Sequence, residues 1–491
     1  MNLISLVKFF FIIIIISILP FGFISYTGTK FYYLIFSAIS SYALISSFNK
    51  DSISFESFFA LLIWLGFWFK FTVQISLFNS LFPEGTGIFD YSSNSYDQIL
   101  VISSVSILAF ISAKQFRLRF IFNYQNEKIN GYDYKDYLTF YFKYRKLIFF
   151  TYLFSIIFFA TINLIYIFFQ KGTIPVSILP FGLNNFINWL LMFGLASFSS
   201  LVIFFEFQLK KKNSNKLIKF GLLETFVSSI SILSRAMIFN GTSIIYGFYR
   251  LIELNNFKIK ISAFIKYLMI ILVLFMTSLL IVSKLRQGKN FPIGHEVHKY
   301  IPMIEFDPNV KTSKKVEKIM LIANDLSKEL NQIIFLVAGR WVGIEGVMAV
   351  YGNKELNLNS LLLSFKDEFD YSNSFYENVV KRSKHIYKKD PEIFTVYVPG
   401  IVAFLFYSKS LILLFCMIFL LCIFCSIVEY FAFRMSKGNV IFSYLIGNIL
   451  AYRLAHFGYM PQNSYKLILA IFITIFLIHL GLKAVKFFNK N

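Results

Sequence analysis

The sequence predicts an all-α polytopic membrane protein with about 10–12 transmembrane helices and one large extracytoplasmic loop. Of its 491 residues, 57% are hydrophobic and only 15% are charged, whereas a soluble chain of this length needs far more charged surface. The hydrophobic residues gather into stretches of about 20, the length that a helix needs to cross a bilayer. These stretches are 4–26, 30–47, 54–78, 97–113, 147–169, 187–208, 262–283, 410–433, 439–458 and 465–484.

The basic residues predict the orientation of these spans. Loops 114–146 and 209–219 carry eight and five lysines or arginines, whereas loops 79–96 and 170–186 share a single lysine. Because short cytoplasmic loops are rich in basic residues, we expect the first two loops inside and the other two outside. Lys8 and the basic tail place both termini in the cytoplasm. The first span is too long for a signal peptide and has no A-x-A cleavage site.

One polar segment, 284–393, interrupts the spans and falls outside the cytoplasm when the spans are counted from either end. It holds 14 of the chain's 26 acidic residues and three of its five histidines. We therefore divide the chain into an N-terminal transmembrane bundle (1–283), this extracytoplasmic loop, and C-terminal transmembrane helices (394–491). The run Gly339–Gly346 is apolar and rich in glycine, so we expect the middle of the loop to pack back onto the bundle and to cover a site at the outer leaflet.

The stretch 220–250 is too short for two full spans, although it must leave the cytoplasm and return. A re-entrant pair broken near Asn240-Gly241 and two short, tilted spans both satisfy this requirement. Within the stretch, four polar residues share one predicted helix face: Glu224, Ser228, Ser231 and Arg235. This stripe is interpreted either as an internal tether between helices or as the wall of a site.

Further charged residues are expected at the depth of the outer leaflet. Lys70 lies in the outer half of the third span, Arg453 and His456 lie at the outer end of 439–458, and Arg340 lies in the returning part of the loop. Arginine presents a planar pair of donors to phosphate oxygens, and such pairs strengthen where water is excluded. Taken singly, each cation also fits a solvated or snorkelling side chain. Together they indicate a site for a diphosphate.

Several other chemistries have no support in the sequence. The net charge of +22 is concentrated in the short loops between spans, so it reflects membrane orientation and not a nucleic-acid partner. Cys422 and Cys425 lie in an apolar stretch and are expected to pack within a helix. His295 and His298 lack the spacing of a zinc helix. No nucleotide-binding or serine-hydrolase motif is present, and we expect neither a metal nor another cofactor.

Three stretches, together with this architecture, resemble the O-antigen (oligosaccharide repeat-unit) polymerases of the Wzy type. The stretches are Glu224–Asn240 (ETFVSSISILSRAMIFN), Gly339–Val350 (GRWVGIEGVMAV) and Pro399–Ser408 (PGIVAFLFYS). The resemblance implies a glycosyltransferase of the bacterial cytoplasmic (inner) membrane that uses no nucleotide sugar. Such an enzyme transfers a growing glycan from undecaprenyl diphosphate to a new lipid-linked repeat unit on the outer face. Its partners are the lipid-linked oligosaccharide, the bilayer, a chain-length regulator and a flippase.

The resemblance assigns Arg340 to the loop arginine that engages the anionic donor. We nominate Glu345 as the general base, with the role of ion partner to Arg340 as the alternative. The remaining substrate-binding candidates, taken from the charge pattern, are Arg235, Arg453, His456, Lys70 and Glu224.

Three other functions remain open at this stage. An O-antigen ligase shares the loop and the lipid donor, and typically presents a loop Arg and His, for which Arg340 and His385 are available. A polysaccharide flippase needs charged cavities in the bundle but no large outer domain. A metal-dependent glycosyltransferase needs an acidic pair in its first outer loop, where Glu84, Asp90 and Asp97 are scattered.

Overall fold

The computed structural model describes fourteen parts of the chain. They are residues 3–80, 82, 85–123, 134–170, 177, 179–210, 218–234, 238–255, 261–290, 338–339, 341–367, 375–380, 398–457 and 461–488. Regular structure within these parts is entirely helical. Eight of the described helices are long and apolar enough to cross a membrane. The protein is therefore an all-α, multi-pass membrane protein, which confirms the predicted class.

The helices follow the predicted spans closely. In the N-terminal part they are α1 (Leu3–Ser25), α2 (Lys30–Ser47), α3 (Ser54–Trp64), η1 (Leu65–Phe69), α4 (Lys70–Leu77), α5 (Ser93–Phe116), η2 (Arg117–Ile121), α6 (Lys135–Tyr166), η4 (Pro180–Gly182), α7 (Leu183–Trp189), η5 (Leu190–Gly194), α8 (Leu195–Lys210), α9 (Ile218–Ser231), α10 (Ile238–Leu254) and α11 (Ile261–Asn290). The remainder are α14 (Ile344–Gly352), α15 (Leu358–Ser364), α16 (Phe375–Val380), α17 (Gly400–Leu405), η8 (Phe406–Ser408), α18 (Leu411–Met435), α19 (Val440–Ala455) and α20 (Pro461–Phe488).

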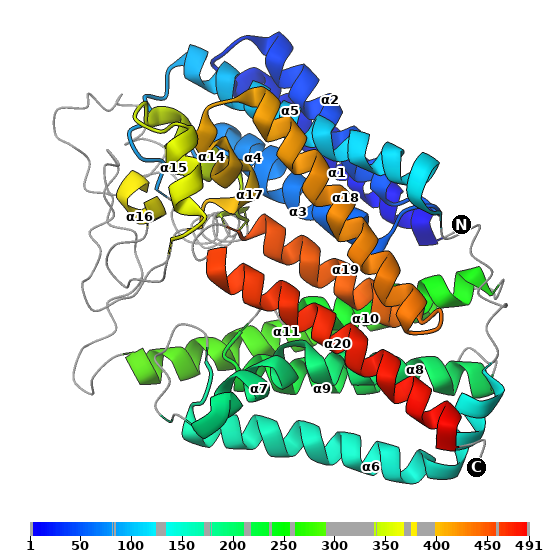
Figure 1. The fold of residues 1–491 in the computed structure, drawn as a ribbon. Coiled ribbons are helices and arrows are strands. Elements are labelled where there is room, and N and C mark those ends of the chain that lie inside the picture. Colours follow the sequence, from blue (N-terminus) through cyan, green and yellow to red (C-terminus); the bar gives the residue numbers. More distant parts are fainter. Residues whose placement is uncertain are drawn as a thin grey trace, which may run out of the picture.

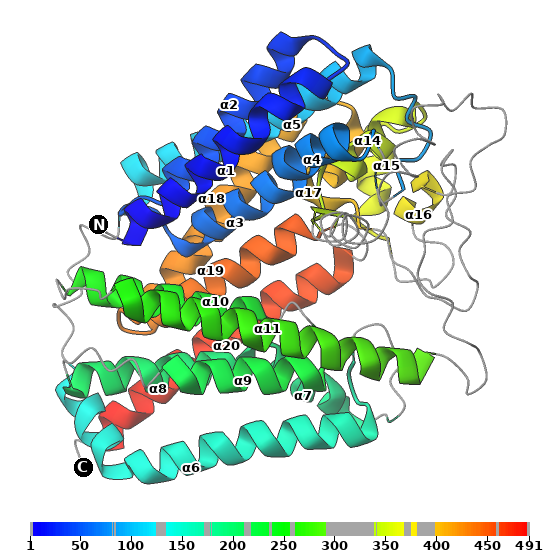
Figure 2. The same cartoon turned by 180° about the vertical axis from the view of Figure 1, so that it is seen from behind.

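The long helices run side by side, so the bundle has two distinct ends (Figures 1 and 2). At one end, called here the termini end, α1 begins and α20 finishes. At the other, called the far end, lie the short helices α14 to α17. The interior helix α19 packs against α3, α10 and α18, and α5 packs against α2 and α18. Because α19 is covered on several sides, nearly all of its side chains are buried.

One continuous helix, made of α3, η1 and α4, extends toward the far end. Its middle section, η1, is a π-helical turn at Leu65–Phe69. A π turn inserts an extra residue into a helix, changes the face on which later side chains lie, and is frequent at functional sites. Lys70 is the first residue after this turn, and its side chain is fully buried.

The break within the stretch 220–250 lies a few residues before Asn240-Gly241, near which it was expected. The helix α9 ends at Ser231, Leu233 takes a left-handed backbone conformation (φ 53°), and α10 begins at Ile238. Asn240 and Gly241 therefore lie in the first turn of α10. Gly241 allows the two helices to approach closely, because a Cβ there would lie 3.2 Å from Thr225 Oγ1.

Candidate functional site

The segment around Gly343 lies buried against the helix that contains η1. A Cβ at Gly66 would overlap the carbonyl oxygen of Val342, and one at Gly343 would lie 2.5 Å from the carbonyl oxygen of Gly66. Only glycine permits backbone-to-backbone approach this close. Beyond it, the side chains of α14 from Ile344 to Val350 are buried. Gly66 and Gly343 therefore bring the backbone of Val342 and Gly343 against η1.

Lys70 holds this segment by three contacts. Its Nζ donates hydrogen bonds to the carbonyl oxygens of Gly339 and Trp341, both at 2.9 Å, and forms an ion pair with Glu345. The side chains are 0% exposed for Lys70 and 2% for Glu345. An ammonium group has three hydrogens to donate, so all three are engaged. In this arrangement Lys70 has no donor left for a phosphate, although the sequence suggested it as a substrate-binding cation.

Glu345 is likewise occupied. Its carboxylate pairs with Lys70 across 275 positions of sequence. A carboxylate held in a buried ion pair already has its charge compensated by the cation. The contact supports the role of ion partner over that of general base, with Lys70 as the partner that the structure describes. Arg340, the partner expected from the sequence, lies outside the described residues.

Arg453 and His456 lie at the far end of α19. The Arg453 side chain is partly buried, and its guanidinium forms no hydrogen bond or ion pair within the described part of the chain. The His456 ring stacks on Tyr452 with 4.2 Å between ring centroids, and its Nδ1 lies 3.0 Å from the Tyr452 carbonyl oxygen. This end of α19 therefore presents, beside a fixed imidazole, an arginine that has no acceptor among the described residues.

The far end of α19 and the segment held by Lys70 meet at Gly400, the first residue of α17. Gly400 has a φ of +78°, and a Cβ on it would lie 3.1 Å from both the Ala455 carbonyl oxygen and Val342 Cγ1. Its N–H donates to the Phe457 carbonyl oxygen at 3.0 Å. An apolar crevice opens at this point, and it is lined by Phe59, Ile63, Val342, Gly343, Ile401 and Ala455 among others. We call this place the junction.

Glu224, another predicted site residue, is not at the junction. Glu224 is fully buried on α9, which packs against α6, α8, α10 and α11. Arg235 lies outside the described residues, and since α9 ends at Ser231 the predicted helical stripe does not continue to it. Ser231 instead bonds to Asn163 of α6. The structure thus brings Lys70 and Glu345 together, places Arg453 and His456 nearby, and separates Glu224 from them.

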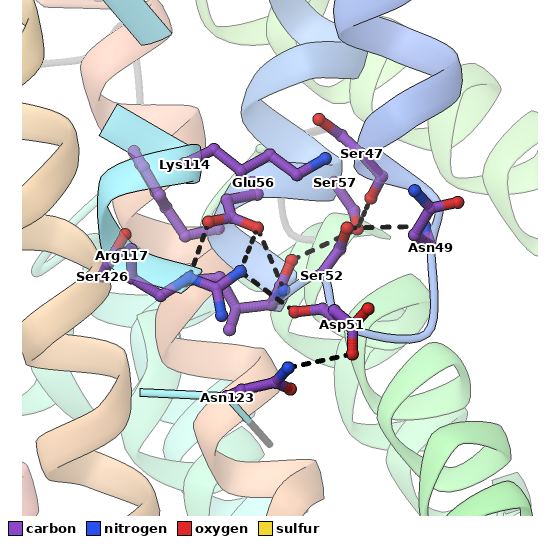
Figure 3. A network of polar contacts seen from close by, with 12 residues as sticks. Ser47, Asn49, Asp51, Ser52, Glu56, Ser57, Lys114, Arg117, Asn123 and Ser426 are labelled. Atoms are coloured by element: carbon purple, nitrogen blue, oxygen red, sulfur yellow. Dashed lines mark hydrogen bonds and ion pairs between the residues drawn. The ribbon is translucent and has the colours of Figure 1, made fainter. Parts of the chain in front are cut away.

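A polar network at the termini end was missed by the sequence reading (Figure 3). Arg117, counted there as a loop charge, is fully buried and pairs with Glu56 through Nε (2.9 Å) and Nη2 (2.7 Å). It also donates to the carbonyl oxygens of Asp51 and Phe122, each at 3.0 Å. The feature of the sequence that could have indicated this ion pair is Glu56, a carboxylate inside the apolar stretch 54–78. These saturated contacts fix helices to one another and leave little for a ligand.

A second buried carboxylate lies at the same end. Glu429 of α18 accepts hydrogen bonds from the backbone N–H groups of Ser54 (2.9 Å) and Phe55 (2.7 Å) at the start of α3. The N-terminus of a helix carries a partial positive charge, which stabilises a carboxylate placed there. Glu429 therefore joins α18 to α3.

No metal centre is found in the described parts of the chain, where His, Cys, Asp and Glu side chains do not gather in groups of three or more. Cys422 and Cys425 are buried in α18 as free thiols. His295 and His298 lie outside the described residues. Comparison of the chain with protein-family models, with curated proteins and with solved structures found no match.

Proposed function

We propose that this protein polymerises lipid-linked oligosaccharide repeat units, as a glycosyltransferase on the outer face of the bacterial inner membrane. Both termini would then be cytoplasmic, and the far end would face outward. The substrates are two undecaprenyl-diphosphate-linked glycans, and the product is an O-antigen or a related surface polysaccharide. A chain-length regulator and a flippase are the protein partners in this scheme. The resemblance in sequence supplies the reaction, and the geometry of the junction supports it.

The observation that carries this proposal is the Arg453 guanidinium. It is partly withdrawn from water at the far end, has no acceptor in the described part of the chain, and lies two residues before Ala455 of the junction. Withdrawing a charge from water is unfavourable unless an opposite charge compensates it. A diphosphate supplies that charge in the bidentate geometry that arginine prefers.

Lys70 has a positioning role in this proposal. It fixes the carbonyl groups of Gly339 and Trp341, which flank Arg340 in the sequence. Arg340 remains the sequence-based candidate for gripping the donor diphosphate. Fixing the backbone on both sides of a catalytic residue lowers the entropy lost on reaching the reactive geometry.

The proposed glycosyl transfer exchanges one bond at the anomeric carbon of the donor for another. A hydroxyl oxygen of the acceptor glycan forms a bond to the anomeric carbon of the donor, and the bond from that carbon to the diphosphate oxygen breaks. The electron pair leaves with the diphosphate, where arginine stabilises the developing charge. The hydroxyl proton must pass to a base. Glu345 could serve only after release from Lys70.

The test is an Arg453→Gln variant expressed in a strain lacking the native gene. Because Arg453 forms no hydrogen bond with described residues, the variant should keep the thermal unfolding midpoint of the wild type while surface glycans shorten to a single repeat. Arg434→Gln is the matched control, since Arg434 is an exposed arginine in the last turn of α18. Wild-type chain lengths from a folded Arg453→Gln protein would refute the site.

Deletion of the gene separates the alternatives. A single repeat on each lipid supports the polymerase. Polymeric chains that stay on the lipid carrier with no surface glycan indicate a ligase, and repeats trapped on the cytoplasmic face indicate a flippase. Either of the last two results would refute the proposed reaction.

A further inference from the structure

The carboxyl group of Glu224 lies in a second polar site, within the packing of α9 and apart from the junction. Its side chain is 0% exposed. The Ser228 hydroxyl donates to Glu224 Oε1 at 2.8 Å, and Thr225 Oγ1 lies 3.4 Å from Oε2. These two hydroxyl groups, both on α9 itself, are the hydrogen-bonding partners found for the carboxyl group in the described part of the chain.

Among the described side chains, the helices packed around α9 bring no cation to this carboxyl group. From α6 the titratable neighbour is Tyr152, which interacts electrostatically with Glu224. From α8, Ser199 faces Gly221. From α10 the neighbours at this level are Ile244 and Gly241.

The two remaining elements packed on α9 are η5 and α11. All five residues of η5 are apolar (LLMFG). Helix α11 touches α9 through Ser278, whose hydroxyl lies 2.7 Å from that of Ser229. The lysines and the arginine of α11 are near its two ends. An ionised Glu224 would therefore be a buried charge without a counter-charge, which proteins avoid by neutralising the group.

We propose that Glu224 is a proton-binding site, which the folded protein holds as a neutral carboxylic acid. Removing this proton places a negative charge between α9 and its neighbours α6 and α8, so the packing of these helices depends on the proton. Ionisable residues buried within membrane proteins often mark places where protons bind or pass. This site stands whether or not the protein transfers glycans.

The test uses the purified full-length protein in lipid and the variant Glu224→Gln. A glutamine side chain has nearly the same shape as the protonated acid, carries no charge, and accepts from Ser228 through its oxygen. Infrared spectroscopy of the wild type at neutral pH should show the carbonyl stretch of a buried carboxylic acid, shifted in D₂O and absent from Glu224→Gln. A spectrum in which the Glu224 signal is a carboxylate, or in which sodium alters it at constant pH, would overturn the proposal.

Stability provides an independent readout. Wild-type protein should lose stability as the pH rises above the ordinary titration range of a glutamic acid, because unfolding then releases the proton that the folded state retains. Glu224→Gln should match the wild type at the acidic end of this range and lose less stability as the pH rises. An equal loss in wild type and Glu224→Gln would contradict a proton on Glu224.

Discussion

Replacing Lys70 by methionine should release the segment that contains Gly339 and Trp341 from the bundle. Methionine has a similar length and fills the same space, but it cannot donate hydrogen bonds or balance a charge. The change leaves the Glu345 carboxylate buried without its cation and removes the donor from both carbonyl oxygens. The effect should therefore exceed that of an ordinary surface lysine.

The magnitude follows from the burial of the pair. Breaking a fully buried ion pair by removing one partner costs about 3–5 kcal/mol, because the remaining charge stays out of water. Each carbonyl that loses its donor adds about 1–3 kcal/mol if water does not replace it. A change of about 3–5 kcal/mol shifts the equilibrium for detaching the segment by roughly 150- to 4,000-fold. Such a shift is local, so most of the bundle should be unaffected.

Hydrogen–deuterium exchange of the amide groups in α14 measures this opening directly. Exchange in α14 should accelerate strongly in Lys70→Met, while exchange in α18 stays constant. Lys70→Arg keeps the charge and several donors and should show a smaller effect. The double variant Lys70→Met with Glu345→Met leaves no buried charge at this place. It should therefore recover the part of the lost amide protection in α14 that came from the unpaired carboxylate.

Exchanging the two charges provides the decisive variant. Lys70→Glu combined with Glu345→Lys restores an ion pair, but a carboxylate at position 70 would face the carbonyl oxygens of Gly339 and Trp341. We therefore expect no recovery from this exchange. Full recovery, or unchanged exchange of α14 in Lys70→Met, would show that the contacts with the carbonyl groups do not hold the segment.

Three further predictions concern packing and charge. Gly343→Ala forces a Cβ to within 2.5 Å of the Gly66 carbonyl oxygen, so it should lower the thermal unfolding midpoint through a strain of about 1–3 kcal/mol. Gly481→Ala is the control, because a Cβ there meets nothing within 4 Å and should leave the midpoint unchanged. Arg117→Met leaves Glu56 unpaired and should cost about 3–5 kcal/mol of stability without changing glycan length in the protein that folds. Burial lowers the pKa of Lys409 from 10.5 to about 8, so the unfolded chain binds more protons than the folded protein between these two pH values. The thermal unfolding midpoint of the wild type should therefore rise with pH in this range, and that of Lys409→Met should not.

The helices could be predicted from the sequence because their signal is local. A backbone that crosses lipid must satisfy its own hydrogen bonds, so a long apolar stretch such as 411–435 has one regular solution, a helix. No comparable local pattern marks the place where the helix is interrupted within the stretch 220–250. Asn240-Gly241 has the composition of a turn, yet Gly241 serves a close helix crossing. The chain turns instead near Leu233, whose left-handed conformation no sequence rule favours.

The candidate site was predictable only in part. Lys70 and Glu345 both attracted notice as charges in apolar surroundings, but their pairing joins residues 275 positions apart, and spacing rules reach only a few turns of one helix. The same limit applies to Arg117, because a basic residue after a span fits a cytoplasmic loop as well as a buried pair. Whether a charge is solvated or paired depends on tertiary packing.

The two buried ion pairs together constrain how the protein can move. The continuous helix of α3, η1 and α4 is held at the termini end by Glu56 with Arg117, and toward the far end by Lys70 with Glu345. Releasing either pair leaves a buried charge without its partner, which costs about 3–5 kcal/mol. Fewer than about one molecule in a hundred therefore has the Lys70–Glu345 pair open at a given moment. The backbone at Gly339 and from Trp341 to Glu345 is therefore held as a wall of the junction. Substrate access to Arg453 must then depend on other elements.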